Sequence, residues 1–281
     1  MTGTDPLVVP PTTDAADLAK IVCEACWAHF RSWQAWPGIT VHTEPDLTWT
    51  EAPIPHVFFN QVYGARFSRR ETRRRISTIV TQAQHRGMPV IWRIGPDSTP
   101  DNLGLRLEEG GFTFADDALA MSVDLGVFEI EEQALPHIQI ETVRDDAGLR
   151  EWTSVGVEGF GFPDFAEDPV FALHRAIGLD PARSHEMYLA RIDGEAVGMA
   201  TLVTDCGVAT LQNLATREKA RRRGVGTALT RHVMREGRKR GLATGVLQAS
   251  TMGQGIYRTI GFREVGRVVE YLLVAPNQGQ P

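Results

Sequence analysis

The stretch ARRRGVGTAL, residues 220–229, places three arginines and two glycines directly before a helical pattern. A helix N-terminus leaves backbone N–H groups without partners and carries about half a positive charge. Both properties favour a bound phosphate, and the guanidinium groups of residues 221–223 add charged donors. Gly224 and Gly226 have no Cβ, so a phosphate can approach the backbone closely. The stretch therefore predicts a loop that binds pyrophosphate.

Two familiar phosphate-binding motifs do not fit this stretch. A Walker loop requires G-x-x-x-x-G-K-[ST], and that pattern is not found here. A dinucleotide fingerprint requires a third glycine, but Leu229 stands at its position. The next predicted strand also ends, at Gln248-Ala249-Ser250, without an acidic residue. Considered alone, the stretch also fits a solvated, arginine-rich start of a surface helix.

Two motifs in order resemble those of the GNAT acyltransferases. Arg221-x-x-Gly224-x-Gly226 resembles the Q/R-x-x-G-x-G/A motif of that family, with a strand, LQNLAT, before it and a helix after it. The later run LQASTMGQGIYRTIGF resembles the second segment of the family, with Tyr257 four residues before Gly-Phe. The resemblance covers residues 138–275 and specifies the superfamily without specifying an acceptor.

The resemblance implies acyl-CoA, most simply acetyl-CoA, as the donor of an acyl group to an amine. In the family, the pyrophosphate lies on the amides of the glycine motif, and the pantetheine arm pairs with the preceding strand like an added strand. That strand splays from the next one, here residues 243–249, and so opens a slot for the arm. The residues expected to contact acyl-CoA are Leu214, Ala215, Thr216, Arg221, Arg222, Arg223, Gly224, Val225, Gly226, Thr227 and Ser250.

Tyr257 is implied as the general acid that protonates the departing CoA thiolate. A free phenol has a pKa near 10 and a thiol about 8.5, so the tyrosine hydroxyl would mainly stabilise the sulfur by hydrogen bonding and relay a proton. The alternative is a half-buried packing residue on a short helix.

The general base is not evident from the sequence. Family members often carry a glutamate on the strand before the phosphate loop, but this strand has Gln212 and Asn213. Glu158 and Asp164, which flank the loop GFGFPDF, are the candidate carboxylates, and each also fits plain surface charge. The three phenylalanines of that loop could line an acceptor pocket or pack between the two halves of the chain.

The two halves of the chain resemble each other, which predicts a tandem duplication. HRGMPVIWRIGPDS, LRLEEGGF and ALAMSVDL in the first half parallel KRGLATGVLQASTM, IYRTIGF and VVEYLLV in the second. The expected fold is of the α/β (α+β) class, with two GNAT-like domains that each have a mixed, mostly antiparallel central sheet flanked by helices. The expected organisation is a flexible lead-in at 1–13, a degenerate GNAT-like domain at 14–130, a catalytic GNAT domain at 131–275 and a tail at 276–281.

The first half has lost the phosphate motif. An alignment without gaps places Arg70 and Thr72 at the two glycine positions, and an alignment of the arginine runs places Ile76 and Thr78 there. The tyrosine position holds Leu107. We therefore expect one acyl-CoA per chain. The tandem layout is similar to that of mycothiol synthase, but layout alone does not assign that substrate.

Composition narrows the remaining function classes. The formal net charge is −6, which disfavours a nucleic-acid or membrane-surface binder as a whole, although residues 65–75 carry six arginines. Cys23 and Cys26 form a C-x-x-C inside a helical pattern, residues 14–33, and lack the further ligands of a zinc site, so we expect no metal. Three cysteines and no secretory signal predict the cytoplasm.

The function expected from these observations is N-acetyltransferase activity by direct attack of an amine on the thioester. The acceptor is expected to be a small molecule or a peptide, with no nucleic-acid or membrane partner, and a homodimer is possible. The alternative is a non-catalytic regulator that binds acyl-CoA.

Overall fold

The structure, a computed structural model, describes residues 8–128, 137–180 and 184–274. The first half contains α1 (Ala15–Ser32), η1 (Trp33–Ala35), β1 (Thr40–Glu44), β2 (Leu47–Glu51), η2 (Val57–Phe59), β3 (Gln61–Tyr63), α2 (Thr72–Arg86), β4 (Val90–Ile94), α3 (Leu103–Glu109) and β5 (Thr113–Asp124). The second half contains β6 (Gln139–Thr142), α4 (Asp146–Phe160), η3 (Asp164–Ala166), α5 (Glu167–Ile177), β7 (His185–Ile192), β8 (Glu195–Val203), η4 (Asp205–Gly207), β9 (Ala209–Thr216), η5 (Glu218–Ala220), α6 (Val225–Lys239), β10 (Thr244–Ala249), α7 (Gln254–Thr259) and β11 (Arg263–Leu273).

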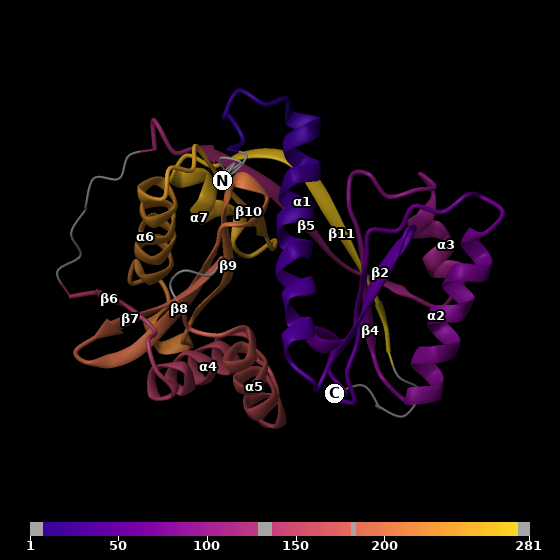
Figure 1. Ribbon diagram of the computed structural model, residues 1–281, viewed down its shortest axis with the longest axis horizontal. Helices are drawn as coiled ribbons and strands as arrows, with labels where there is room; N and C mark the ends of the chain where they lie inside the picture. Colours follow the sequence, from indigo (N-terminus) through magenta and orange to yellow (C-terminus); the bar gives the residue numbers. More distant parts are fainter. Residues whose placement is uncertain (1–7, 129–136, 181–183, 275–281) are drawn as a thin grey trace, which may run out of the picture.

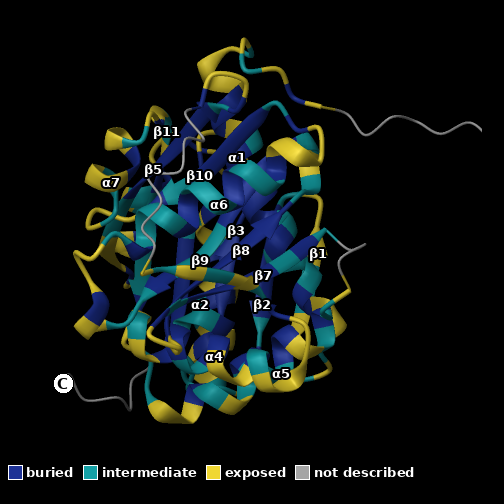
Figure 2. Ribbon diagram, turned by 90° about the vertical axis from the view of Figure 1, so that its left-hand side faces the viewer, coloured by how far each residue is buried: buried dark blue, intermediate teal, exposed yellow. Residues whose placement is uncertain are grey.

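All the strands of the described residues lie in one sheet, in the order β1-β2-β3-β4-β11-β5-β10-β9-β8-β7-β6. Its pairs are antiparallel except β3 with β4 and β9 with β10. Helices pack on the sheet, whose strands are largely buried (Figures 1 and 2). The mixed, mostly antiparallel sheet flanked by helices confirms the predicted fold class.

The two halves exchange their last strands within this sheet. β11 of the second half lies between β4 and β5, with Val269 opposite Ile94 on one side and Asp117 on the other. β5 of the first half also pairs with β10, where Met121 stands opposite Leu247. The two predicted sheets are therefore joined into one, because each half completes the sheet of the other. The predicted boundary near residue 130 lies outside the described residues.

The repeated order of elements supports the duplication. Each half contains a strand, a helix, a parallel strand, a short helix and a long strand, as β3-α2-β4-α3-β5 and β9-α6-β10-α7-β11. Gly87 follows α2 directly and Gly241 follows α6 after Arg240, and both glycines have positive φ. Phe112 N donates to Leu107 O at 3.0 Å, and Phe262 N donates to Tyr257 O at the same distance. The same local hydrogen bond therefore follows both short helices, as the alignment of the halves predicts.

α1 lies between the two halves in Figure 1 and packs across the exchanged strands. Asp14 caps this helix by accepting a hydrogen bond from Ala16 N at 2.8 Å, so the predicted start is confirmed. Cys23 and Cys26 are both buried on α1, and burial raises the pKa of Cys26 to about 12. These two cysteines are packing residues, because a thiol with a raised pKa is a poor nucleophile and a poor ligand.

The run at residues 56–63, whose apolar character predicts one strand, is divided. Val57–Phe59 forms a 3-10 turn, and only Gln61–Tyr63 is strand. His56 caps the turn through Nδ1, which accepts a hydrogen bond from Phe58 N at 3.2 Å. Phe58 meanwhile packs on Trp33, with ring centroids 4.8 Å apart. Tertiary packing of the aromatic side chains therefore overrides the local preference for an extended chain.

Candidate functional site

A β-bulge in β9 gives the site its shape. β9 pairs with β8 so that Ala215 faces Met199 and Gln212 faces Thr201, which leaves one extra residue on β9. Asn213 lies in this bulge with φ of +52°. The bulge also changes which side of the sheet the strand presents: Ala209 meets Gly237 of α6, whereas Ala215, six residues on, meets Gly159 of α4. In a regular strand these two alanines would share a face.

Beyond the bulge, β9 separates from β10. Their parallel pairing ends at Leu211 opposite Leu247, although β9 continues to Thr216 and β10 to Ala249. The edge of β9 that faces β10 therefore has no ladder partner in residues 212–216. The splayed pair expected from the resemblance is present, and an extended chain could pair with this edge.

The arginine–glycine stretch forms the start of α6. It follows the C-terminal end of β9, where the slot between β9 and β10 opens. Gly224 is the N-cap residue with φ of +86°, a left-handed conformation that glycine adopts without strain. The helix has no side-chain cap, and no described residue accepts a hydrogen bond from the amides of residues 222–227. The three arginine side chains are exposed, and Gly226 and Thr227 are partly exposed. These amides are consequently free to bind an anion at a helix N-terminus.

Gly226 keeps this surface open. A Cβ placed at Gly226 would have Cδ2 of Leu214, 4.0 Å away, as its nearest neighbour outside the helix turn, so nothing in the protein requires glycine here for space. Arg221 has a structural role as well, because its guanidinium donates to Gly159 O at 3.1 Å and to Thr216 O at 3.4 Å. Arg221 thereby ties the end of α4 and the end of β9 to the start of α6.

Tyr257 lies on α7 beside this region and is largely buried, with 8 % of its surface exposed. Its ring meets Phe262 edge-on at a centroid distance of 5.8 Å, and burial raises the pKa of the phenol. The hydroxyl is therefore a neutral hydrogen-bond donor at neutral pH, while the ring packs in the core. Ser250 is exposed, and its carbonyl accepts hydrogen bonds from Gly253 N and Gln254 N before α7 begins.

Among the described residues, neither candidate carboxylate makes a hydrogen bond or ion pair with Gln212 or Asn213 of β9. Glu158, at the end of α4, forms an ion pair with Arg217. Arg217 also donates to Ala196 O at 2.9 Å and to Ser154 Oγ at 3.0 Å, so the guanidinium is held in place. Asp164 is exposed in η3. The ion pair holds the Glu158 carboxylate against Arg217, so we expect it to stay there rather than turn toward an amine.

One of the two roles that the sequence left open for the aromatic loop, packing between the halves, is found in the structure. Phe162 packs on His56 and Phe58 of the first half, at centroid distances of 4.5 and 5.2 Å, so packing between the halves is confirmed for this residue. Phe160 and Phe165 are exposed.

Two histidines that the sequence does not single out lie behind the bulge. His29 of α1 and His185 of β7 are both buried, with Nδ1 of His29 3.0 Å from Nε2 of His185. The amide nitrogen of Asn213 lies 3.5 Å from Nε2 of His29. These groups come from three distant parts of the chain, and no local spacing in the sequence connects them.

The equivalent region of the first half is closed. α2 begins at Thr72 and α6 begins at Val225. When the two helix starts are superposed, Glu71 and Arg73 correspond to Gly224 and Gly226, so neither pair of residues from the sequence alignments is the structural equivalent. The amides of Glu71 and Thr72 donate to Ser68 O at 3.1 Å each. The predicted loss of the phosphate motif holds, because both side chains and backbone hydrogen bonds occupy its place.

A tryptophan fills the space between the parallel strands of the first half. Trp27 of α1 lies 3.8 Å from a Cβ placed at Gly64, which follows β3, and 3.0 Å from one at Gly95, which follows β4. Its ring stacks on Tyr63 at 5.5 Å and is 2 % exposed. A pantetheine arm could not enter this space without displacing the ring.

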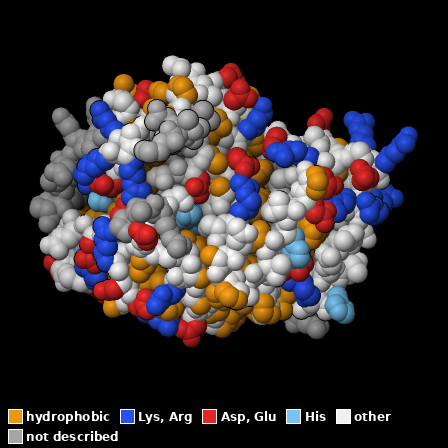
Figure 3. Space-filling model, in the orientation of Figure 1, with side chains coloured by type: hydrophobic (Ala, Val, Ile, Leu, Met, Phe, Trp, Pro, Cys, Tyr) orange, Lys and Arg blue, Asp and Glu red, His pale blue; other side chains and the backbone are white. Residues whose placement is uncertain are grey.

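The arginine-rich segment of the first half is largely committed to ion pairs. Arg75 donates to Asp46 at 2.6 Å and also pairs with Glu44, while Arg66 pairs with Asp97. Arg73 and Arg74 of α2 are exposed, and Figure 3 shows blue side chains gathered at its upper right, on the side of the molecule where Figure 1 places α2 and α3. Carboxylates interrupt this patch, so its charge is mixed.

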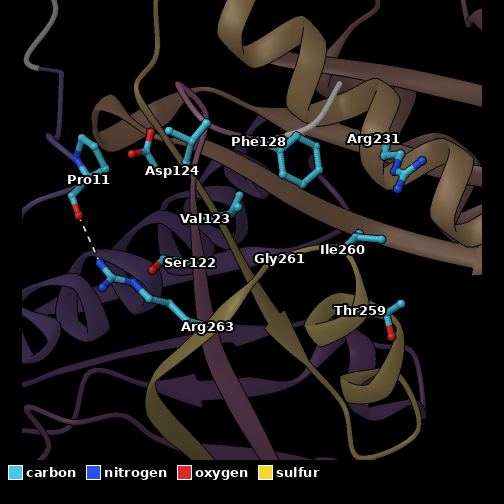
Figure 4. Close-up of a pocket in the computed structure, with 11 residues that line it drawn as sticks. Pro11, Ser122, Val123, Asp124, Phe128, Arg231, Thr259, Ile260, Gly261 and Arg263 are labelled. Atoms are coloured by element: carbon cyan, nitrogen blue, oxygen red, sulfur yellow. Dashed lines mark hydrogen bonds between the residues drawn. The ribbon is translucent and has the colours of Figure 1, made fainter. Parts of the chain in front are cut away.

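A cavity of about 530 Å³ lies elsewhere, between β5, β11, α6 and α7 (Figure 4). Ser122, Asp124, Arg231 and Arg263 are among its lining residues, and Arg263 donates to Pro11 O at 3.0 Å. None of the predicted site residues lines it. Among the described residues, no group of three or more metal-binding side chains is found, and no helix is long and apolar enough to cross a membrane.

Comparison with known proteins identifies the class. Residues 183–264 match the family model of the acetyltransferase (GNAT) domain. This segment contains the bulge, the splayed strands, the glycine loop and Tyr257. The second half therefore carries a GNAT acetyltransferase domain.

Solved structures extend the likeness of the fold to the whole chain. A GCN5-related N-acetyltransferase from Kribbella flavida is 17% identical, with a TM-score of 0.68, over 95% of this chain and 97% of its own. Another from Sphaerobacter thermophilus is 18% identical, with a TM-score of 0.63, over 98% and 96%. A tandem GNAT protein from the clavulanic acid biosynthesis pathway is 12% identical, with a TM-score of 0.58, over 98% of both chains. No curated protein matches the sequence.

Proposed function

We propose that the second half binds acetyl-CoA and transfers its acetyl group to an amine. The observation that carries this proposal is the set of unpartnered amides at residues 222–227, at the end of a slot between two diverging strands. The GNAT family uses acetyl-CoA as co-substrate, and the arrangement suits its two recognisable parts. The diphosphate matches the helix N-terminus, and the amide-containing pantetheine arm matches a free strand edge.

The direction of the pantetheine arm follows from the positions of the helix N-terminus and the free edge of β9. The diphosphate would lie on residues 222–227, with Arg222 and Arg223 free to add charge. The arm would run along Leu214 to Thr216, the part of β9 that β10 leaves unpaired. Its thioester end would then reach the bulge, where the strands meet.

In the proposed reaction, the neutral amine attacks the thioester carbon directly, forming the C–N bond as the C–S bond breaks. The sulfur leaves as CoA thiolate and is stabilised by the hydroxyl of Tyr257, whose raised pKa keeps its proton in place until transfer. The amine loses one proton to solvent or to a buffer base. Glu158 is paired with Arg217 and Asp164 is exposed, so we assign the general base to neither of them.

Release of CoA thiol tests this function. Acetyl-CoA and a panel of small amines and peptides would be incubated with the protein, and thiol would be followed with a chromogenic disulfide. We expect amine-dependent release for at least one acceptor, with an acetylated amine as the second product. Binding of acetyl-CoA without release for any acceptor would favour the alternative, a regulator that binds acyl-CoA. This second function is favoured by one observation: Gln212 and Asn213 carry side-chain amides on the strand where family members often carry a glutamate.

We further propose that only the second half binds acyl-CoA. Trp27 fills the strand slot of the first half, and Ser68 O accepts hydrogen bonds from the amides of Glu71 and Thr72 at the start of α2. The first half would instead complete the shared sheet and shape the acceptor side through α1 and the contacts of Phe162.

A further inference from the structure

A chain of polar side chains connects the β9 bulge to a buried pair of imidazoles. Asn213 Nδ2 lies 3.5 Å from Nε2 of His29, and Nδ1 of His29 lies 3.0 Å from Nε2 of His185. Nδ1 of His185 in turn lies 3.1 Å from the hydroxyl of Ser184. This chain of polar side chains joins the two halves of the protein, because His29 belongs to α1 of the first half and the other members belong to the second half.

The hydrogens in this chain can all point in one direction. An amide nitrogen only donates, so Asn213 Nδ2 makes Nε2 of His29 the acceptor. A neutral imidazole with an acceptor at Nε2 carries its hydrogen at Nδ1, and His29 then donates to Nε2 of His185. By the same rule, His185 donates from Nδ1 to Ser184 Oγ. In this order both imidazoles carry their hydrogen at Nδ1, and Nε2 of His185, which also lies 3.4 Å from Ser32 Oγ, is an acceptor.

Both imidazoles are in the neutral form that this order requires. His29 is fully buried, and burial together with the neighbouring His185 and His174 lowers its pKa well below the usual value. Burial also lowers the pKa of His185, opposed by the carboxylate of Asp205. A protonated His29 would present N–H groups at both nitrogens and could no longer accept from Asn213.

The chain fixes the free end of the Asn213 side chain. Nδ2 is used by His29 and by Thr201 Oγ1, each at 3.5 Å, while no described residue donates to Oδ1 of Asn213. Asn213 is partly exposed, unlike His29 behind it, and lies at the end of the slot where the proposed arm would place its thioester. An amide oxygen at this point can accept a hydrogen bond from an N–H group.

We propose that Asn213 Oδ1 binds the N–H of the attacking amine, and that His29 and His185 are positioning residues that hold the Asn213 amide in this orientation. This inference rests on the proposed acetyl transfer and adds a specific amine-binding group to it. The hydrogen bond strengthens as the nitrogen gains positive charge during attack, so it favours the transition state over the bound amine. The first half thus contributes a residue to the reaction of the second half.

Three substitutions separate the roles. Asn213→Gly removes the side chain at a positive φ that glycine accepts. His29→Gln retains an acceptor near the position of Nε2, whereas His29→Asn retains polarity only near Nδ1 and leaves Asn213 without its partner. His174→Asn, which replaces another buried histidine on α5, is the matched control.

We expect kcat/KM for the amine to fall roughly tenfold or more in Asn213→Gly and several-fold in His29→Asn, since one hydrogen bond to a developing charge is lost. His29→Gln should retain most of the activity, His174→Asn should match the wild type, and the Kd of CoA should stay unchanged in all four variants. Wild-type kcat/KM in Asn213→Gly, or equal losses in His29→Gln and His29→Asn, would overturn the inference. Absence of acetyl transfer by the wild-type chain would instead defeat the proposed function, and the inference with it.

A second readout is independent of activity. Nitrogen-15 NMR of labelled histidines, assigned with His29→Gln and His185→Gln variants, reports which ring nitrogen carries the hydrogen. The order of the chain requires the Nδ1–H tautomer for both His29 and His185 at neutral pH. An Nε2–H tautomer at His29 would contradict it.

Discussion

At the scale of single residues, Tyr257 shows how one side chain can serve both packing and chemistry. Its ring belongs to the core beside Phe262, and its hydroxyl has the raised pKa of a buried phenol. A donor that stays protonated is suited to a thiolate leaving group. The ring contacts persist without the hydroxyl, so the two roles can be separated by experiment.

Replacing Tyr257 with phenylalanine should lower kcat by roughly 10²-fold, because general acid catalysis is lost while the ring is kept. The melting temperature and the Kd of acetyl-CoA should change little. Tyr188→Phe is the control, since the Tyr188 hydroxyl donates to Glu186 on β7. Steady-state kinetics at saturating substrate make the comparison, and an unchanged kcat would remove Tyr257 from the mechanism.

His174 makes stability depend on pH. It is 1 % exposed, and burial lowers its pKa to about 4, below the value of about 6.5 in an unfolded chain. The unfolded state therefore binds a proton first as the pH falls. The full stability is present above pH 6.5 and is lost progressively toward pH 4, by up to roughly 3 kcal/mol for this group.

Urea unfolding between pH 7.5 and 4.5 measures this effect. The free energy of unfolding should fall less steeply with pH in His174→Asn than in the wild type, whereas His85→Asn, at an exposed position of α2, should leave the slope unchanged. Parallel profiles for His174→Asn and the wild type would show that His174 is not the titrating group.

At the scale of elements, the start of α6 and the bulge of β9 work as a unit. The bulge ends the pairing with β10 and turns Leu214 toward Gly226, while Gly224 turns the chain into the helix. Arg221 fixes both to α4. The slot and the anion site are thus consequences of one irregular strand and one glycine-started helix.

Gly226→Ala tests the anion site without disturbing the fold. The added methyl group has room in the free protein, so stability should stay the same or rise slightly, but it would occupy the space of a phosphate against the backbone. We expect the Kd of CoA to rise about tenfold or more by calorimetry. Gly148→Ala is the matched control, because Gly148 also lies in the first turn of a helix, α4, with ordinary van der Waals space. Equal affinities for both variants would argue against a diphosphate on this backbone.

At the scale of the whole molecule, the exchanged strands join the two halves into one folding unit. β5 contributes Leu119, Met121 and Val123 to the same core cluster as α6 and β10. Each such side chain stabilises a fold by about 1.5–3 kcal/mol when buried. Their sum is comparable to the whole stability of a typical domain, roughly 5–15 kcal/mol.

The second half alone, residues 137–274, should therefore fail to fold cooperatively. Circular dichroism should show no sharp thermal transition, and addition or co-expression of residues 8–128 should restore one. A sharp transition for the isolated second half would show that β5 is dispensable and that the halves are independent domains.

The sequence predicts the elements and the glycine loop well because their signals are local. The arginine–glycine stretch, Tyr257 before Gly-Phe, and the Asp14 cap each involve neighbours in the chain. The Asp193-Gly194 dipeptide, a pair of residues typical of hairpin turns, likewise forms the turn between β7 and β8. Two features were not predicted correctly. Strand exchange depends on pairing between strands that are distant in the sequence. α2 begins at Thr72, so Glu71 and Arg73 stand where α6 has its two glycines, and neither alignment of the halves places them there.

In the candidate site too, the features that the sequence did not predict depend on contacts between distant parts of the chain. Nothing near His29 in the sequence indicates that α1 would bring it to Asn213 of β9, or that Trp27 would fill the slot of the first half. Both depend on how α1 crosses the shared sheet. The position of Glu158 and Asp164 beside a loop suggests them as candidate general bases. Only the fold shows that Glu158 pairs with Arg217 and that Asp164 is exposed to solvent.

Amide hydrogen exchange with and without acetyl-CoA tests the central claim most directly, because the two halves offer two comparable helix starts. We predict that ligand slows exchange of the backbone amides at residues 222–227, at the start of α6, and leaves residues 71–76, at the start of α2, unchanged. Unchanged exchange at residues 222–227 under saturating acetyl-CoA, or equal protection at both helix starts, would contradict a single diphosphate site on α6.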